Sequence, residues 1–280
     1  MKIQYLGTGA AEGIPAIFCD CEVCRRAMRA GGKNIMTRSQ ALIDDTILID
    51  FAGDTYGHFL KLGRTLSGIE HVFVTHSHAD HLSIDDMPNR CAGMAYNLSA
   101  PKLTMYMSRE VIEQVRRRLD ADIMPIAEAE KFYTFVSLEY YKPVTAAGYT
   151  VTPLPARHKP PEQTFVFLIE KDGKSIFYGN DTGIFGDEID NYLAENKKHI
   201  DILSLDCTKG DREQDYYVHM SMRECRTIAD RFSARGIIDA KTQIVMTHFS
   251  HNCGMIYDEL VAAAKKYGFT VAYDGRTVEA

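Results

Sequence analysis

The sequence predicts an α/β or α+β protein in which helices cover β-sheets. Three observations support this fold class. Short β-rich runs recur along the whole chain, helical patterns lie between some of them, and two early hairpins precede an alternation of strand and helix. The 280 residues contain no internal repeat, no low-complexity segment and no linker rich in Pro, Gly or Ser. We therefore expect residues 1–280 to form a single domain.

The predicted strands are short runs rich in β-branched, aromatic and other apolar residues. In chain order they cover residues 2–6, 41–44, 46–50, 71–75, 103–107, 132–139, 149–154, 164–170, 175–178, 202–206, 244–247 and 270–273.

The clearest helical pattern covers residues 221–235. Its apolar positions are spaced by three and four, which marks one buried stripe; they are Met222, Cys225, Ala229 and Phe232. Ser221 and Glu224 predict a capping box at its start, and Gly236 follows its end. Helices are also predicted at residues 111–119 and 255–265.

The composition argues against binding through charge alone. Lys and Arg total 32 against 38 for Asp and Glu, so the formal net charge is −6. This balance gives little attraction to nucleic acid or to an anionic membrane. No apolar run has the roughly 18 to 20 residues of a membrane span, and residues 1–7 lack the apolar core of a secretory signal. We expect a cytoplasmic protein.

The seven cysteines are an odd number, which argues against a disulfide framework. Cys19, Cys21 and Cys24 have the Cys-x-Cys-x-x-Cys spacing of a tetrahedral zinc site. His251 is the candidate fourth ligand and Cys253 is its competitor. Four protein ligands leave no open position, so we expect a structural zinc that holds the loop of residues 7–38. We expect the remaining cysteines to be small core residues; they are Cys91, Cys207 and Cys225.

The strongest functional motif is His76-Ser77-His78-Ala79-Asp80-His81, directly after a predicted strand. Neutral imidazoles and carboxylates bind divalent ions such as zinc and manganese. A tight loop can direct His76 and His78 towards one ion, and Asp80 and His81 towards a second. Further polar residues stand at strand ends and are expected in the same crevice at the sheet edge; they are Asp50, Asp206 and His248.

With this motif, the chain resembles the metallo-β-lactamase superfamily over essentially its whole length. The resemblance implies a four-layer αβ/βα sandwich with a two-metal site along the shared sheet edge. It also implies three more ligands, each after a later strand: His158, Asp181 and His248. The implied first ion is held by His76, His78 and His158. The implied second ion is held by Asp80, His81 and His248, and Asp181 bridges the two.

Three segments together resemble the phosphoribosyl cyclic phosphodiesterase branch of that superfamily. They are Gly7-Thr8-Gly9-Ala10-Ala11-Glu12-Gly13-Ile14-Pro15, the cysteine triplet, and His248-Phe249-Ser250-His251. The branch implies manganese in the active site, a structural Cys₃His zinc, a homodimer, and a catalytic histidine that matches His219. His219 precedes the predicted helix, whose N-terminus suits a phosphate and should depress the pKa of this histidine.

These features lead to the hypothesis of a binuclear metal-dependent phosphodiesterase that acts on a small, cyclic phosphodiester. A hydroxide bridging two manganese or zinc ions would attack phosphorus, with Asp80 and Asp181 holding the ions. His219 would stabilise the phosphate or protonate the leaving group, and Asp50 would orient a metal-bound histidine.

Three alternatives remain open. An acyl hydrolase acting on lactams, lactones or thioesters could use the same metals, although such relatives usually lack the cysteine triplet. An RNA-processing nuclease shares the phosphodiester chemistry, but the net charge of −6 argues against it. A non-catalytic binding module is least favoured, because the full set of metal ligands is present.

Overall fold

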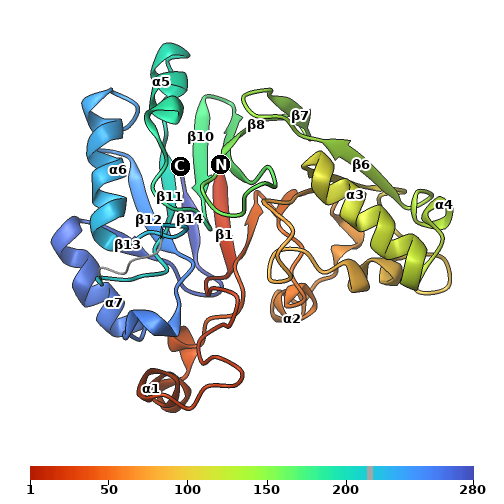
Figure 1. Cartoon of the computed structure of the whole chain (residues 1–280), viewed down its shortest axis with the longest axis horizontal. Coiled ribbons are helices and arrows are strands. Elements are labelled where there is room, and N and C mark those ends of the chain that lie inside the picture. Colours follow the sequence, from red (N-terminus) through yellow and green to blue (C-terminus); the bar gives the residue numbers. More distant parts are fainter. Residues whose placement is uncertain (213–216) are drawn as a thin grey trace.

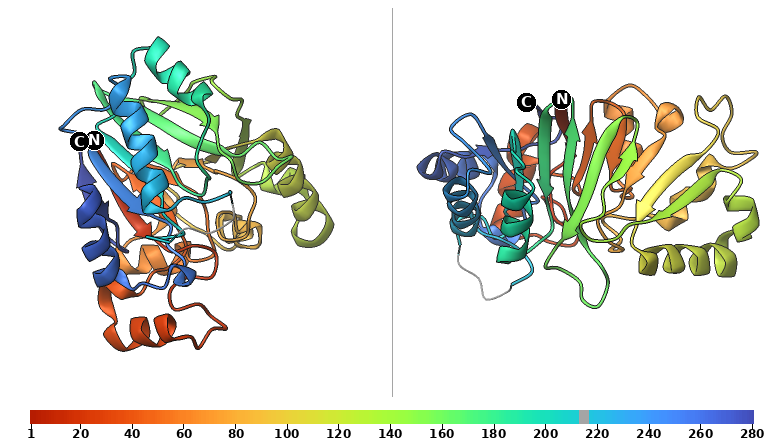
Figure 2. Two further views of the ribbon diagram at one scale, coloured as in Figure 1. Left: turned by 60° about the vertical axis from the view of Figure 1, so that its left-hand side comes forward. Right: turned by 90° about the horizontal axis from the view of Figure 1, so that it is seen from above.

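The computed structural model describes residues 1–212 and 217–280, and within them two seven-stranded sheets pack face to face (Figures 1 and 2). The first sheet, in spatial order, contains β14 (Thr277–Glu279), β1 (Lys2–Gly7), β2 (Gln40–Ile43), β3 (Ile47–Ile49), β4 (His71–Phe73), β5 (Leu103–Met107) and β6 (Tyr133–Ser137). Its β14-β1-β2-β3 half is antiparallel, and β3 to β6 run parallel.

The second sheet is also mixed. In spatial order it contains β13 (Thr270–Val271), β12 (Gln243–Thr247), β11 (Ile202–Asp206), β10 (Lys174–Gly179), β9 (Phe165–Lys171), β8 (Tyr149–Pro155) and β7 (Val144–Ala146). Strands β10 to β13 are parallel, whereas β7 to β10 are joined as antiparallel hairpins.

Helices cover the outer face of each sheet. The first sheet carries α2 (Thr55–Lys61), α3 (Arg109–Arg118) and α4 (Ile126–Ala129), and the second carries α5 (Asp187–Glu195), α6 (Met222–Ala234) and α7 (Tyr257–Ala264). Helix α1 (Glu22–Ala30) lies at the end of the molecule away from the two termini (Figure 1). Shorter helical turns cover Gly32–Asn34, Leu66–Gly68, Ile84–Arg90, Leu119–Ile123, His251–Cys253 and Lys265–Tyr267. No helix in the described ranges is long and apolar enough to cross a membrane.

The alternation of side chains along each strand produces three cores. In β3, Ile47 and Ile49 are buried between the two sheets, while Leu48 is buried under the outer helices. In β10, Tyr178 lies between the sheets and Phe177 packs beneath α6. Because both faces of these strands are covered, their sequences read as continuous apolar runs. Helix, sheet, sheet and helix layers therefore form the predicted αβ/βα sandwich.

The twelve predicted strands and three predicted helices are present, with boundaries that shift by a few residues. The predicted capping box at Ser221 and Glu224 is confirmed. The prediction of a loop over residues 7–38 was wrong in part, because α1 begins directly after Cys21. This helix buries only a narrow stripe made by Val23, Cys24 and Ala27, so its apolar pattern is weak. Helices α2, α4 and α5 and the three-residue strands β7 and β14 were also missed.

Candidate metal centre

The candidate ligands come from loops that leave both sheets at one edge. The segment with His76, His78, Asp80 and His81 follows β4 of the first sheet. His158, Asp181 and His248 follow β8, β10 and β12 of the second sheet, respectively. Asp50, Asp181 and His248 have left-handed backbones, with φ of 67°, 51° and 61°. Such conformations are uncommon outside glycine, and this strain is typical of functional sites.

One group of ligand atoms contains three imidazoles and a carboxylate: His76, His78, His158 and Asp181. His78 Nδ1 lies 2.8 Å from His76 Nε2 and 3.0 Å from His158 Nε2. Nitrogens bound to one tetrahedral zinc ion lie about 3.3 Å apart, so this geometry is close to that of a metal site. Burial lowers the pKa of all three histidines, which favours the neutral imidazoles that bind metals.

A second group contains Asp80, His81, Asp181 and His248, all buried. His81 Nε2 lies 3.2 Å from Asp80 Oδ2 and 3.0 Å from Asp181 Oδ2, and His248 Nε2 lies 3.7 Å from the same Asp181 oxygen. Burial opposes protonation of His81, but the carboxylates around it, first among them Asp50, hold its pKa well above the ordinary value. The group therefore favours positive charge at its centre.

Orphaned polar atoms test whether these residues fit metal ions. His81 Nε2, His248 Nε2 and Asp181 Oδ1 are buried and make no well-aligned hydrogen bond, although a possible ion-pair partner lies 3.0 to 3.7 Å from each. Buried polar atoms that make no hydrogen bond are rare in native proteins, and a bound ion is one of the standard explanations. The three atoms belong to the two groups, and Asp181 belongs to both. The donor set therefore fits two divalent ions that share one carboxylate.

Asp50 lies behind the motif loop and is fully buried. Its Oδ2 accepts a hydrogen bond of 2.7 Å from His81 Nδ1, and its Oδ1 accepts bonds from the Thr75 N–H at 2.7 Å and hydroxyl at 2.9 Å. This contact fixes the ring of His81 with Nε2 directed to the second group. The geometry is that expected of a residue that orients a metal-bound histidine.

Asp206 occupies the equivalent place in the second sheet, at the end of β11. It was expected in this crevice from the sequence, but no role was assigned to it. Its Oδ2 lies 2.9 Å from His219 Nδ1 and 3.4 Å from His248 Nδ1, while Oδ1 accepts the N–H groups of Thr208 and Met220. The sequence contains a pattern that could have predicted this role, because Asp206 ends an apolar run just as Asp50 follows one. Asp206 also forms a third group of potential ligands with Asp181, His219 and His248.

His219 lies beside the shared carboxylate, just before α6. Its Nδ1 is 3.2 Å from Asp181 Oδ1, and its ring stacks on His248 with centroids 5.5 Å apart. The expectation of a depressed pKa was wrong. Burial lowers the pKa, but the charges of Asp206 and Asp181 outweigh burial and raise it to about 9. Two buried carboxylates in contact act more strongly than a helix terminus.

Glu162 was not identified from the sequence, and no sequence motif marks it. Its carboxylate accepts the Ser77 N–H at 2.8 Å and the Ser77 hydroxyl at 2.5 Å, and it pairs with Lys159 at 3.0 Å. Ser77 stands between two candidate ligands, and Lys159 follows another, His158. Glu162 therefore ties the motif loop of the first sheet to a ligand loop of the second.

A separate group contains Cys19, Cys21, Cys24 and His251. His251 Nδ1 lies 3.7 Å from Cys19 Sγ and 3.5 Å from Cys21 Sγ, close to the roughly 3.5 Å between sulfur and nitrogen ligands on one tetrahedral zinc ion. The Cys24 backbone and the His251 side chain lower the pKa of Cys21 to about 6, which favours the thiolate. Cys253 is not in this group; it is buried and bonds to the Met255 carbonyl.

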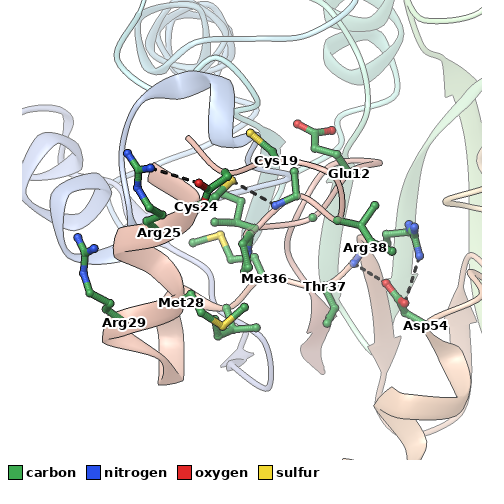
Figure 3. Close-up of a pocket in the computed structure, with 17 residues that line it drawn as sticks. Glu12, Cys19, Cys24, Arg25, Met28, Arg29, Met36, Thr37, Arg38 and Asp54 are labelled. Carbon is green, nitrogen blue, oxygen red and sulfur yellow. Dashed lines mark hydrogen bonds and ion pairs between the residues drawn. The ribbon is translucent and has the colours of Figure 1, made fainter. Parts of the chain in front are cut away.

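Glu12 lies between the cysteine group and the histidine groups. It accepts a hydrogen bond from the Ser250 hydroxyl and lies 3.8 Å from His251 Nε2. It lines a cavity of about 690 Å³ beside Cys19 and Cys24, which Arg38 and Asp54 border on the far side (Figure 3).

A smaller cavity opens directly over the two histidine groups. Its volume is about 220 Å³. Its walls combine candidate ligands with residues from the neighbouring loops: Ala10, Ala11, Glu12, His78, Asp80, His158, Asp181, Thr208, His219, His248, Ser250 and Asn252.

The comparison with protein families identifies the class of the protein. A family model described as "Beta-lactamase superfamily domain" matches residues 45–249, and this chain belongs to that family. Metal binding and hydrolysis are the properties that this superfamily membership and the histidine and aspartate groups support.

Solved structures with the same fold cover nearly all of the chain. A diphosphatase from the PhnP family has a TM-score of 0.75 and 20% identity, with 100% of this chain and 97% of that chain covered. Zn²⁺-bound PqqB from Methylobacterium extorquens has a TM-score of 0.72 and 19% identity, with both chains fully covered. Human tRNase Z, short form, has a TM-score of 0.66 and 17% identity, with 100% and 99% covered. At these identities, the likeness shows the fold.

A sequence match to a curated protein is partial. The protein is named octanoyltransferase, from Porphyromonas gingivalis (strain ATCC BAA-308 / W83), and it is 31% identical over 124 residues. The match covers 42% of this chain and 23% of that protein, so the chain matches less than a quarter of the relative's length.

Proposed function

We propose that this protein is a phosphodiesterase that uses two divalent ions, manganese or zinc, to hydrolyse a small cyclic phosphodiester. The observation that carries the proposal is Asp181, which is shared by two ligand groups at the base of one small cavity. Two divalent ions against Asp80 and Asp181 leave a net charge of about +2, which attracts an anionic ester. When bound, such ions act as Lewis acids and lower the pKa of water.

The residues of this chain divide into ion-holding and positioning groups. His76, His78 and His158 are proposed to hold one ion, and Asp80, His81 and His248 the other. Asp50 contacts Nδ1 of His81 and Asp206 contacts Nδ1 of His248, and these contacts fix the orientation of the two rings. These carboxylates determine which ring nitrogen faces the cavity.

His219 is proposed to act on the substrate. Its Nδ1 is held by Asp206, whose carboxylate raises the pKa of the ring and is not one of the two carboxylates proposed to hold the ions. An imidazolium held in this way can bind a phosphoryl oxygen or give its Nε2 proton to the leaving alkoxide.

The size of the cavity favours a small substrate over RNA. A volume of about 220 Å³ lies below the usual range for drug-sized ligands. The Glu12 carboxylate on its wall can accept hydrogen bonds from the hydroxyl groups of a sugar, but it repels a second phosphate. The net charge of −6 also disfavours nucleic acid.

The cysteine group is proposed to hold a structural zinc ion. Three thiolates and one imidazole fill a tetrahedral site, so no position remains for substrate. His251 lies three residues after the candidate ligand His248, so a zinc ion there would anchor the loop that carries both.

Hydrolysis of bis(p-nitrophenyl) phosphate and of five-membered cyclic ribosyl phosphates tests the proposal. The manganese-loaded protein should hydrolyse both classes. Asp181→Ala should abolish turnover, while Asp54→Asn, which removes a carboxylate outside the cavity, should retain it. Turnover that persists in Asp181→Ala would contradict the role of the shared carboxylate.

An acyl hydrolase is the second candidate, and the partial match to a protein named octanoyltransferase favours including it in the test. An octanoyl thioester should therefore be assayed in parallel. Thioester cleavage that depends on Asp181, with no cleavage of any phosphodiester, would replace the phosphodiesterase proposal.

A further inference from the structure

A third cavity, separate from the metal centre, lies on the helix-covered side of the first sheet. Its volume is about 300 Å³, and none of the candidate metal ligands lines it. Two short helical turns, Leu66–Gly68 and Ile84–Arg90, and the segment of residues 95–98 enclose it. Its walls are mainly apolar and include Phe51, Leu66, Leu98, Leu103 and Tyr133.

Arg90 is the unusual residue of this cavity. Its side chain is buried, with 9% exposure, and it lines the cavity. One guanidinium nitrogen donates to the Ala100 carbonyl at 2.7 Å, but Nε has no hydrogen-bond partner. Within residues 1–212 and 217–280, no carboxylate lies within ion-pair distance of Arg90. By contrast, Arg116 and Arg118 on the neighbouring surface both pair with carboxylates.

A buried charge without a counter-ion is strongly unfavourable, and buried charges in native proteins are almost always paired. Burial lowers the pKa of Arg90, in line with this missing partner. The guanidinium nevertheless stays charged in a protein. An anion that enters the cavity can supply the missing partner.

We propose that this cavity binds a small organic carboxylate, with its carboxylate on Arg90 and its apolar body against the walls. A guanidinium matches the planar shape of a carboxylate and can donate two parallel hydrogen bonds. The hydroxyl groups of Thr65 and Ser67 also line the cavity. Asp86 also lines the cavity, outside ion-pair distance of Arg90. Its negative charge repels a phosphate dianion more strongly than a monoanion.

The cavity also adjoins the backbone that supports the metal centre. The Phe51 N–H donates to the His81 carbonyl at 2.8 Å, and the Phe51 carbonyl accepts from the Ser83 N–H at 2.7 Å. Phe51 directly follows Asp50, whose side chain holds the His81 ring. An occupant therefore lies against the segment that positions a candidate ligand. The binding proposal itself does not rest on the proposed function.

¹⁹F NMR titration of the metal-loaded protein tests this site with 4-fluorobenzoate. Excess inorganic phosphate in the buffer occupies anion sites at the metal centre. We expect saturable binding of 4-fluorobenzoate. The neutral isostere 4-fluorobenzamide and the dianion 4-fluorophenyl phosphate should bind at least about tenfold more weakly.

Three variants locate the binding. Arg90→Met should weaken 4-fluorobenzoate at least about tenfold, whereas Arg116→Met, which removes an exposed and paired charge, should leave binding unchanged. Leu98→Trp fills the cavity while Arg90 stays in place and should also abolish binding, which keeps the test valid if Arg90→Met does not fold. Absence of saturable binding to the wild type, or equal binding by Leu98→Trp, would overturn the proposal.

Discussion

Replacing Asp50 by Asn tests how far the metal centre depends on residues that do not contact the ions. The carboxylate accepts one hydrogen bond from His81 Nδ1 and two from Thr75, and it is fully buried. An amide offers one acceptor atom, and its NH₂ group must face a donor. The variant therefore loses the charge-assisted bond to His81 and leaves a buried donor unsatisfied.

The magnitude follows from that lost bond. A hydrogen bond to a charged group contributes about 1.5–3 kcal/mol. At about 1.4 kcal/mol for each factor of ten, this corresponds to a loss of roughly 10- to 150-fold in affinity for the ion held by His81. The figure agrees with the 10- to 100-fold effect typical of residues that orient metal ligands.

Competition for zinc between the protein and a fluorescent chelator measures this loss. The ion proposed for His76, His78 and His158 should keep its affinity, and only the second ion should be weakened. Asp54→Asn is the control, because it makes the same chemical change at a carboxylate outside the metal cavity; its affinities should stay within about threefold. If Asp50→Asn binds every ion within twofold of the wild type, the positioning role of Asp50 is refuted.

Three further substitutions test other parts of the structure. Cys21→Ser should remove one zinc equivalent per chain and leave the other two ions in place, as measured by elemental analysis; an unchanged zinc content would refute the Cys₃His site. Glu162→Gln should lower the free energy of unfolding by about 1–2 kcal/mol, because Ser77 and Lys159 lose a charged partner. Urea denaturation measures this loss of stability, with the exposed Glu113→Gln as control. Equal losses in the two variants would refute the role of Glu162 in tying the two loops together. His58 is buried with 2% exposure, and burial lowers its pKa from 6.5 to about 4. The unfolded chain therefore binds a proton between pH 6.5 and 4 that the folded protein does not, so stability falls as the pH falls through this window. The gap in unfolding free energy between the wild type and His58→Gln should shrink by about 3 kcal/mol from pH 7.5 to 4, and a constant gap would contradict this.

The fold was predictable because its strands are covered on both faces. Runs such as residues 47–49 and 165–169 are apolar throughout, and the turns between them are clear. The helices that the sequence missed have weaker patterns. Helix α2 buries Thr55, His58 and Phe59, of which only Phe59 is strongly apolar, and its Leu60 is 60% exposed, so its apolar residues do not mark the buried face.

The residues of the candidate site also differ in how far the sequence alone predicts them. Ligands in a compact motif, such as His76 to His81, can be found because their spacing is itself the signal. Asp206 and Glu162 act through distant partners, with Asp206 placed 13 residues from His219 and Glu162 placed 85 residues from Ser77. Their roles depend on which strands become neighbours, which spacing along the chain does not encode. The pKa of His219 was mispredicted for the same reason, because the two carboxylates beside it come from other strands.

Each group of candidate metal ligands contains residues from loops of both sheets. Ions bound by these groups would therefore link the first sheet to the second without a covalent bond in the chain. A ligand that binds only the folded state stabilises it by about 4 kcal/mol at a thousand times its dissociation constant. The melting temperature of this chain should then follow the free metal concentration of the buffer. A substitution that releases an ion should therefore lower the free energy needed to separate the two sheets, in addition to abolishing hydrolysis.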